Sequence, residues 1–265
     1  MNILILPKLL YLFRTIPIIR NNKIFKNWST ELSKFIWQGK KPRVKMLNLT
    51  DEKKRGGLGL PDLQLYYEAS ALGWVKDWAT LKDTSMLNLE GFDLRTGWHA
   101  YMWYDKKKLE KNFGNHFIRA ALIKVWDKYK RNFYTRTPRW ISPLEACHRR
   151  ETPRRNWLIY NDIISKREGK WTLKSQEEMK KIDQEISWFQ YFQIKEYFNQ
   201  DNRIGFEENE TTWDRIMKSD KKIISKLYNK LLEWSTSTEG EIMCSSCLEG
   251  YTGMEKCTFF SRNRV

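Results

Sequence analysis

Clusters of lysine and arginine are the residues of this chain whose types and spacing could do chemistry. They are Lys40, Lys41, Arg43 and Lys45; Lys53, Lys54 and Arg55; Lys106 to Lys108; and Arg149, Arg150, Arg154 and Arg155. Pro42 and Pro153 bias the preceding backbone away from helix, so the first and last clusters are expected to be extended loops. Cations on loops bind phosphate backbones, with an affinity that falls as salt rises. For Lys106 to Lys108, solvated surface charge is the favoured interpretation.

The overall composition agrees with a polyanionic partner. The 265 residues include 48 Lys and Arg against 32 Asp and Glu, which gives a formal charge of +16. The excess positive charges repel one another unless a polyanion binds and neutralises them, and nucleic acid is the first candidate for this partner. The alternative is a protein that is merely basic. Aromatic rings beside cations, as in Arg139-Trp140, could stack on bases, although most rings fall at helical spacing and are expected to pack in the core.

Residues for catalysis are sparse. A two-metal polymerase needs carboxylates that converge on the ions, and the sequence contains no Asp-Asp pair. The histidines are His99, His116 and His148, and none stands in a recognisable constellation with a nucleophile or carboxylate. His148 follows Cys147, but adjacent residues in a helix point about 100° apart. We therefore expect no enzymatic activity and no cofactor.

The cysteines and the N-terminal segment bear on metals and location. Cys244 and Cys247 have half-knuckle spacing, but no Cys or His beyond Cys257 completes a zinc site, so no metal is expected. No disulfide framework is implied, which favours a reducing cytoplasmic or nuclear compartment. Lys8 interrupts the apolar start, and Arg14 follows it, so neither a secretion signal nor a membrane span is expected.

Apolar periodicity predicts a mostly α-helical fold with few or no strands. Ile24 to Ile36 form one apolar stripe that Gly39 can end, and Pro61 and Asp62 can open a helix that runs past Trp78. Ile118 to Phe133 give the strongest stripe. The domains predicted are a helical unit at 1–80, a linker at 81–112, a second helical unit at 113–234, and a disordered or unrelated tail at 235–265.

Capping patterns place the later helices. The Ser175-x-x-Glu178 box predicts a helix to about Phe198, and Thr211 to Asp214 begin another. Asp220 can cap a last helix that ends near Trp234. The two prolines within 135–146 predict a loop or a short edge strand. Residues 157–164 could be helix or buried strand by pattern.

An ordered motif series resembles the reverse transcriptases of non-LTR retrotransposons, the long interspersed element class. The pieces are Leu6-Pro-Lys-Leu-Leu-Tyr-Leu-Phe, Phe35-Ile-Trp, Gly56-Gly-Leu-Gly-Leu-Pro-Asp-Leu, Pro138-Arg-Trp-Ile-Ser-Pro-Leu-Glu, Leu173-Lys-Ser-Gln-Glu-Glu, Trp188-Phe-Gln-Tyr-Phe-Gln and Trp213-Asp-Arg-Ile. The likeness runs from Ile3 to about Trp234. It implies a thumb-like first unit and a helical connector, or wrist, as the second, and it favours helix over strand for 157–164.

The resemblance also implies a function. The thumb of such proteins holds the template-primer duplex, and the wrist is implicated in holding element RNA. The polymerase palm, with its Asp pair, should lie before Met1, and the cysteine-rich end of the family is not matched after Ser235. The expected chain is thus a non-catalytic fragment that grips RNA, an RNA–DNA hybrid or a DNA duplex, with a separate palm domain as a further partner.

Two other hypotheses stay open at this point. The chain could be a protein-interaction module, or a degenerate fragment without a nucleic-acid role, whose apolar helix faces lack their original partner. It could also polymerise DNA itself, as the family name suggests, and the missing Asp pair argues against that.

Overall fold

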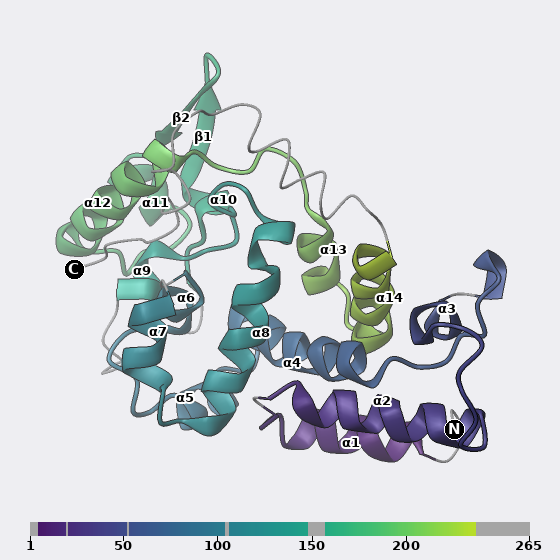
Figure 1. The fold of residues 1–265 in the computed structure, drawn as a ribbon. Helices are drawn as coiled ribbons and strands as arrows, with labels where there is room; N and C mark the ends of the chain where they lie inside the picture. Colours follow the sequence, from purple (N-terminus) through teal and green to yellow (C-terminus); the bar gives the residue numbers. More distant parts are fainter. Residues whose placement is uncertain (1–4, 20, 52, 104–105, 148–156, 237–265) are drawn as a thin grey trace. The chain divides into compact units, whose positions relative to one another are not determined.

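The fold is mostly α-helical, as expected. The computed structural model describes residues 5–19, 21–51, 53–103, 106–147 and 157–236. These residues form fourteen α-helices, one 3-10 helix and one antiparallel pair of strands (Figure 1). The chain divides into two compact units, each drawn from separate stretches of sequence. Among the described residues, unit 1 comprises 5–74, 113–125 and 220–236, and unit 2 comprises 75–112 and 126–219.

Unit 1 is built from helices near both ends of the described chain. Its elements are α1 (Leu6–Thr15), α2 (Lys23–Ile36), α3 (Met46–Thr50), the 3-10 helix η1 (Lys53–Arg55), the first part of α4 (Leu63–Thr80), the start of α8 (Phe117–Phe133) and α14 (Ile223–Thr236). Asp62 caps α4, because its carboxylate accepts from the Leu65 N–H at 3.0 Å. The helix therefore starts one residue after Asp62, and Pro61 precedes the cap.

Aromatic rings form the core of unit 1. The rings of Phe13 in α1, Phe25 in α2 and Tyr67 in α4 meet with centroids 5.4–6.3 Å apart. Tyr66 stacks on Tyr228 of α14 at 3.8 Å, which joins residues far apart in sequence. These edge-on and stacked contacts add to the free energy of burying each ring.

The expected apolar stripe of α2 is only partly covered. Phe25 is buried, whereas Phe35 at the other end of the helix is 83% exposed. Rings from α1 and α4 meet the N-terminal half of α2 at Phe25, and Trp28 packs beside Phe13. Helical spacing predicted the stripe correctly, but spacing cannot tell how long a stripe the neighbouring helices cover.

Unit 2 holds a core of tryptophans. Its further elements are α5 (Thr84–Glu90), α6 (Trp98–Trp103), α7 (Lys106–Phe113), α9 (Pro143–Cys147), α10 (Tyr160–Ile163), β1 (Ile164–Arg167), β2 (Lys170–Leu173), α11 (Gln176–Lys180), α12 (Trp188–Ile204) and α13 (Thr212–Lys218). Trp78 stacks on Trp98 at 4.6 Å, and Trp126 meets Trp213 at 5.1 Å. Helix α9 packs against both α6 and α12.

The segment expected as a linker, 81–112, contains helices α5, α6 and most of α7. Trp98 and Met102 on α6 are almost fully buried. These helices have only seven, six and eight residues. Periodicity needs a window of about 11 residues or more to be recognised, which explains why no helix was predicted there.

The helix expected from Ser175 to Phe198 is two helices. The Ser175 capping box forms, but α11 ends at Lys180 after one and a half turns. A second box follows, in which the Ser187 hydroxyl accepts from the Gln190 N–H and the Gln190 side chain accepts from the Ser187 N–H. Gln176 donates to the Ile186 carbonyl and fixes the turn between them. The second cap restarts the helix at a new angle.

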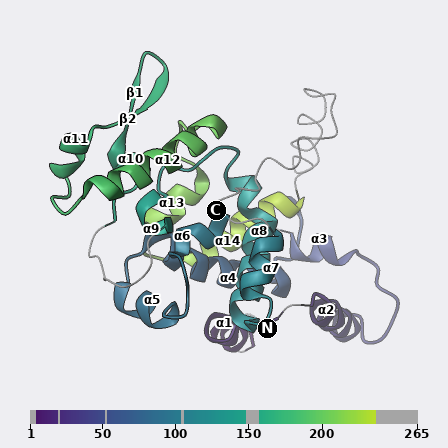
Figure 2. The ribbon, with the colours of Figure 1, turned by 90° about the vertical axis from the view of Figure 1, so that its left-hand side faces the viewer.

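The stretch 157–164, for which the resemblance favoured helix, is helical over Tyr160–Ile163, and a β-hairpin begins at Ile164. Residues 160–163 are helical, and Ile164 then pairs with Leu173 across the β1–β2 ladder. Glu168 and Gly169 both have positive φ, as a two-residue turn requires for the right-handed twist of the strands. Figures 1 and 2 show the hairpin projecting from unit 2 beyond α10.

Other expected elements are confirmed with small shifts. Helix α8 spans Phe117–Phe133, α13 begins after the Thr211 capping box, and α14 extends to Thr236. Within the expected loop at 135–146, Thr137 bridges Phe206, and Pro143 begins α9. Proline fits the first helical turn, where no N–H donor is needed. Residues 237–265, most of the expected tail, lie outside the described residues.

Candidate functional site

Residues 40–55, which we call the basic segment, leave α2 through a tight C-cap. The Gly39 N–H donates to the Lys34 carbonyl and the Gln38 N–H to the Phe35 carbonyl, the bond pair of a Schellman motif. Gln38 has φ of +50° and Gly39 of +75°. The left-handed turn ends the helix as expected near Gly39, and it directs the chain into the cationic stretch (Figure 1).

Main-chain hydrogen bonds hold the second half of the basic segment. The Gly59 N–H donates to the Asp51 carbonyl and the Leu60 N–H to the Leu49 carbonyl, both at 2.9 Å. A Cβ at Gly57 would collide with the main chain of Asp51. Gly57 therefore allows two backbone segments to approach closely. This bracing fixes α3 and η1 without using the charged side chains.

The described cations of the basic segment project into solvent. The side chains of Lys40, Lys41, Arg43, Lys45, Lys53 and Lys54 are exposed. Across the residues that the structure describes, none of these six side chains makes a hydrogen bond or an ion pair. The stem of Lys53 lies 3.7 Å from the position that a Cβ would take at Gly59. Arg55 is the last residue of η1.

The remaining predicted cations fall elsewhere. Arg149, Arg150, Arg154 and Arg155 lie outside the described residues. The two clusters near the N-terminus that were expected to bind nucleic acid both lie in the basic segment of unit 1. The Lys106 to Lys108 cluster begins α7.

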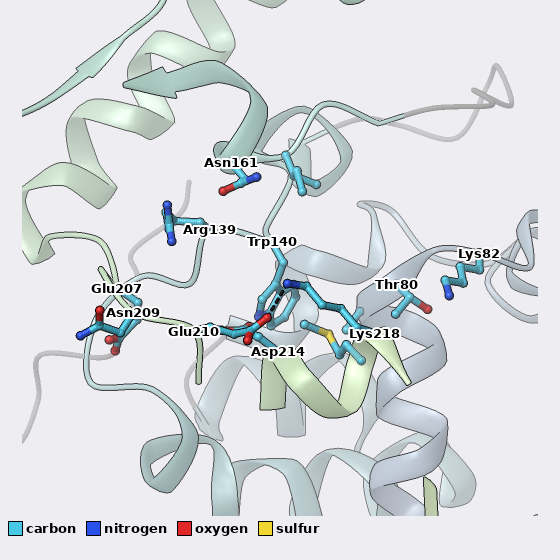
Figure 3. A pocket seen from close by; sticks show the side chains of 13 residues that line it. Thr80, Lys82, Arg139, Trp140, Asn161, Glu207, Asn209, Glu210, Asp214 and Lys218 are labelled. Atoms are coloured by element: carbon cyan, nitrogen blue, oxygen red, sulfur yellow. Dashed lines mark hydrogen bonds and ion pairs between the residues drawn. The ribbon is translucent and has the colours of Figure 1, made fainter. Parts of the chain in front are cut away.

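Unit 2 contains a pocket that the sequence did not predict. Its volume is about 480 Å³, within the range of small-molecule sites. Loops and helix ends from several parts of unit 2 line it, and Figure 3 shows their side chains around the space. The lining residues are Ala79, Thr80, Lys82, Arg139, Trp140, Ile159, Asn161, Glu207, Asn209, Glu210, Asp214, Met217 and Lys218.

A chain of hydrogen bonds fixes one wall of the pocket. The Trp140 indole N–H donates to the Tyr134 hydroxyl at 2.6 Å, and that hydroxyl donates to Asp214 at 2.6 Å. Asp214 also accepts from the Thr211 N–H in the capping box of α13. Burial, reinforced by the charge of Asp214, raises the pKa of Tyr134. The phenol therefore stays protonated and keeps Trp140 in place.

The charged groups around the pocket are mostly compensated. Lys218 donates to Glu210, and this hydrogen bond lowers the pKa of Glu210. Glu207 accepts from the main-chain N–H groups of Thr135 and Arg136. The guanidinium of Arg139 donates to the Glu208 carbonyl and lies over the Trp171 ring. Three cationic and three carboxylate side chains line the space, so its net charge is close to zero.

His99 packs edge-on against Trp140, which lines the pocket. His99 is fully buried, and its Nδ1 accepts from the Ser142 N–H at 2.9 Å. Its Nε2 must then donate to the Ala79 carbonyl, 2.9 Å away, which defines a neutral imidazole. Glu145 accepts from the Trp98 and His99 N–H groups and so caps α6. Both ring nitrogens of His99 therefore form hydrogen bonds with backbone groups.

His116 and Cys147, the other described residues considered for catalysis, take part in local hydrogen bonds. His116 accepts from the Arg119 N–H through Nδ1. The Cys147 thiol points to the Leu144 carbonyl in its own helix, and His148 lies outside the described residues. The described ranges contain no group of three or more His, Cys, Asp or Glu side chains placed to hold a metal ion. In the same ranges, no helix is both long enough and apolar enough to cross a membrane.

Sequence reasoning missed the pocket because its walls are distant in sequence. The one local signal was Arg139-Trp140, a cation beside a ring between two prolines. Asn161 and Asn209 carried no pattern that distinguishes them from ordinary loop residues. No model of a known protein family matches the chain.

Proposed function

We propose that this chain binds nucleic acid without catalysing a reaction, and that the basic segment of unit 1 grips the phosphate backbone of RNA, an RNA–DNA hybrid or a DNA duplex. The supporting observation is the set of six exposed cations without a described partner, of which Lys53 and Lys54 lie in the half of the segment that main-chain hydrogen bonds hold. Binding phosphates relieves their mutual repulsion and releases counterions. The proposed origin is a non-LTR retrotransposon reverse transcriptase, with action in the cytoplasm or nucleus.

The bracing matters for affinity as well as for position. The carbonyl groups of Asp51 and Leu49 hold the glycine-rich stretch 56–60, which leaves the side chains of Lys53 and Lys54 for a ligand. A segment with a fixed backbone loses less conformational entropy when it binds than a flexible loop does. Because phosphate contacts carry no sequence information, this surface is expected to bind duplexes with little preference for sequence.

The test is a fluorescence anisotropy titration with an RNA–DNA hybrid at several salt concentrations. If all six cations contact phosphates, the slope of log K against log salt is about −5. The key variant replaces Lys40, Lys41, Arg43 and Lys45 by Gln. It should bind at least about tenfold more weakly at low salt and reduce the slope by about 3 to 4.

A matched control removes the same number of charges from unit 2. It replaces the exposed Lys170, Lys180, Lys181 and Lys195 by Gln. This variant should keep most of the affinity, because it changes net charge without touching the basic segment. Equal losses in the two variants, or no dependence on salt, would overturn the proposal. Nucleotide incorporation in a primer-extension assay with Mg²⁺ would show that the chain is an enzyme after all.

A second candidate function is protein interaction, favoured by apolar side chains on the outer helices of unit 1. Phe35 is 83% exposed and Tyr11 is 69% exposed. The partner with the clearest rationale is the polymerase palm domain that the resemblance places beside such helices. Mixing the chain with a separately expressed palm domain, in the presence of nuclease, should give a complex that Phe35→Ser and Tyr11→Ser weaken. No complex formation would leave nucleic-acid binding as the sole candidate.

A further inference from the structure

The pocket of unit 2 differs in chemistry from the basic segment. Its charges balance, and its volume of about 480 Å³ is enough for a small organic group. A phosphate group would gain little at a site lined by three cations and three carboxylates, where Lys218 already pairs with Glu210. The ligand that fits such a site is uncharged, carries a flat surface and has several hydrogen-bonding groups at its edge.

Trp140 provides the flat surface. It is half-buried and lines the pocket, so part of its indole remains on the wall. Its N–H is held by Tyr134, and His99 lies edge-on to it with the ring centroids 5.4 Å apart. The orientation of the indole is therefore set before a ligand arrives. A ring fixed in this way stacks on a flat ligand with little loss of conformational entropy.

Two asparagines provide edge recognition. Asn161 and Asn209 line the same pocket, and both are exposed to solvent there. Over the described part of the chain, neither side-chain amide has a hydrogen-bond partner. Each amide offers two donors and one acceptor oxygen, which complement the edges of a heterocyclic base. In Figure 3, Asn161 lies above Trp140, and Asn209 lies at the side near Glu207.

We propose that this pocket binds one unpaired nucleobase, stacked on Trp140 and hydrogen-bonded at its edge by Asn161 and Asn209. The base belongs to a single-stranded part of an RNA or DNA, because a paired base has no free face. Stacking on an aromatic ring tolerates all base types, because every base has a flat π face. The site lies in unit 2, and its test does not depend on the basic segment.

The experiment uses free nucleosides, which carry no phosphate. The full chain, labelled with ¹⁵N at tryptophan, is titrated with adenosine and with uridine while the indole N–H signals are followed. The Trp140 signal is assigned by its loss in Trp140→Phe. We expect this signal to shift saturably, adenosine to bind more tightly than uridine because it stacks over a larger area, and the affinity to change less than twofold between low and high salt.

Variants locate the interaction. Asn161→Ala and Asn209→Ala alter exposed side chains, so they should fold normally and weaken adenosine binding by about five- to tenfold, the loss of one hydrogen bond each. Lys195→Gln, on an exposed face of α12, is the control and should leave adenosine affinity unchanged. The Gln variant of Lys40, Lys41, Arg43 and Lys45 should also keep it.

The outcomes separate this inference from the proposed function. If nucleosides leave the Trp140 signal unchanged, or if both asparagine variants bind adenosine normally, the pocket does not hold a base, whatever the duplex affinity. If adenosine binds while the basic-segment variant grips duplexes as well as the wild type, the proposed function fails and the pocket stands. Displacement of adenosine by free arginine at equal concentration would assign the pocket to a peptide side chain and overturn the proposal.

Discussion

The basic segment of unit 1 and the pocket of unit 2 carry opposite arrangements of charge. In the basic segment, six cations project into solvent without a described acidic partner, and main-chain hydrogen bonds hold the second half of the segment. Around the pocket, Glu210 pairs with Lys218 and Glu207 accepts from backbone, so the charges hold the walls. The contrast teaches that a basic chain can leave its cations exposed in one region and use charged groups to hold structure in another.

The comparison predicts that the two regions differ in how much stability their polar groups provide. The largest effect is expected behind the pocket, at Glu145. Glu145→Ala leaves the buried N–H groups of Trp98 and His99 without an acceptor and should lower the free energy of unfolding by about 2–4 kcal/mol. Urea unfolding followed by tryptophan fluorescence measures it.

The Glu145 prediction has two controls. Glu145→Gln keeps one acceptor oxygen and should cost about half as much. In the basic segment, Lys41→Gln should change the free energy of unfolding by less than about 0.5 kcal/mol, because Lys41 is exposed. Similar losses for Glu145→Ala and Lys41→Gln would remove the distinction between the two regions.

Alkaline pH tests the hydrogen-bond chain of the pocket wall. The pKa of Tyr134 is raised by burial and then by Asp214, so its protonated form stabilises the fold below pH 10 and this contribution is lost as pH rises above 10. Tyr134→Phe should cost about 1–2 kcal/mol at neutral pH. It should also reduce the loss of stability between pH 9 and 11 by about 1.4 kcal/mol.

Tyr67 gives the matched comparison in unit 1. Burial raises the pKa of Tyr67 to about 12, so Tyr67→Phe should also flatten the alkaline loss, within the window from pH 10 to 12. Only Tyr134→Phe should loosen Trp140, however, and so weaken adenosine binding. Unchanged pH profiles in both variants would show that neither phenol is held protonated by the fold.

The smallest effect is expected where the basic segment begins. Gln38 adopts φ of +50° at the C-cap of α2, a conformation that glycine reaches without strain. Gln38→Gly should raise the free energy of unfolding by about 0.5–1 kcal/mol and leave duplex affinity unchanged. Gly39→Ala, at φ of +75°, should lower it by about 1 kcal/mol. A destabilising Gln38→Gly would mean that the Gln38 side chain makes a contribution beyond its backbone.

Local signals in the sequence were reliable where one short stretch of chain decides the structure. The Thr211 and Ser175 capping boxes form as expected, and α8 follows its apolar stripe. The Ser187-x-x-Gln190 box and the Glu168-Gly169 turn are local signals of the same kind, and neither was among the predicted elements. Arg149 to Arg155 remain a prediction, because they lie outside the described residues.

The sequence by itself determined the mostly helical fold, the helix caps and the exposed cations of the basic segment, because each depends on residues within a few positions of one another. Only the tertiary structure decided how much of α2 is covered, that His99 is a neutral structural residue, and that Trp140, Asn161 and Asn209 line one pocket. Those features depend on which distant segments pack together, and periodicity records the direction of a side chain but not its partner.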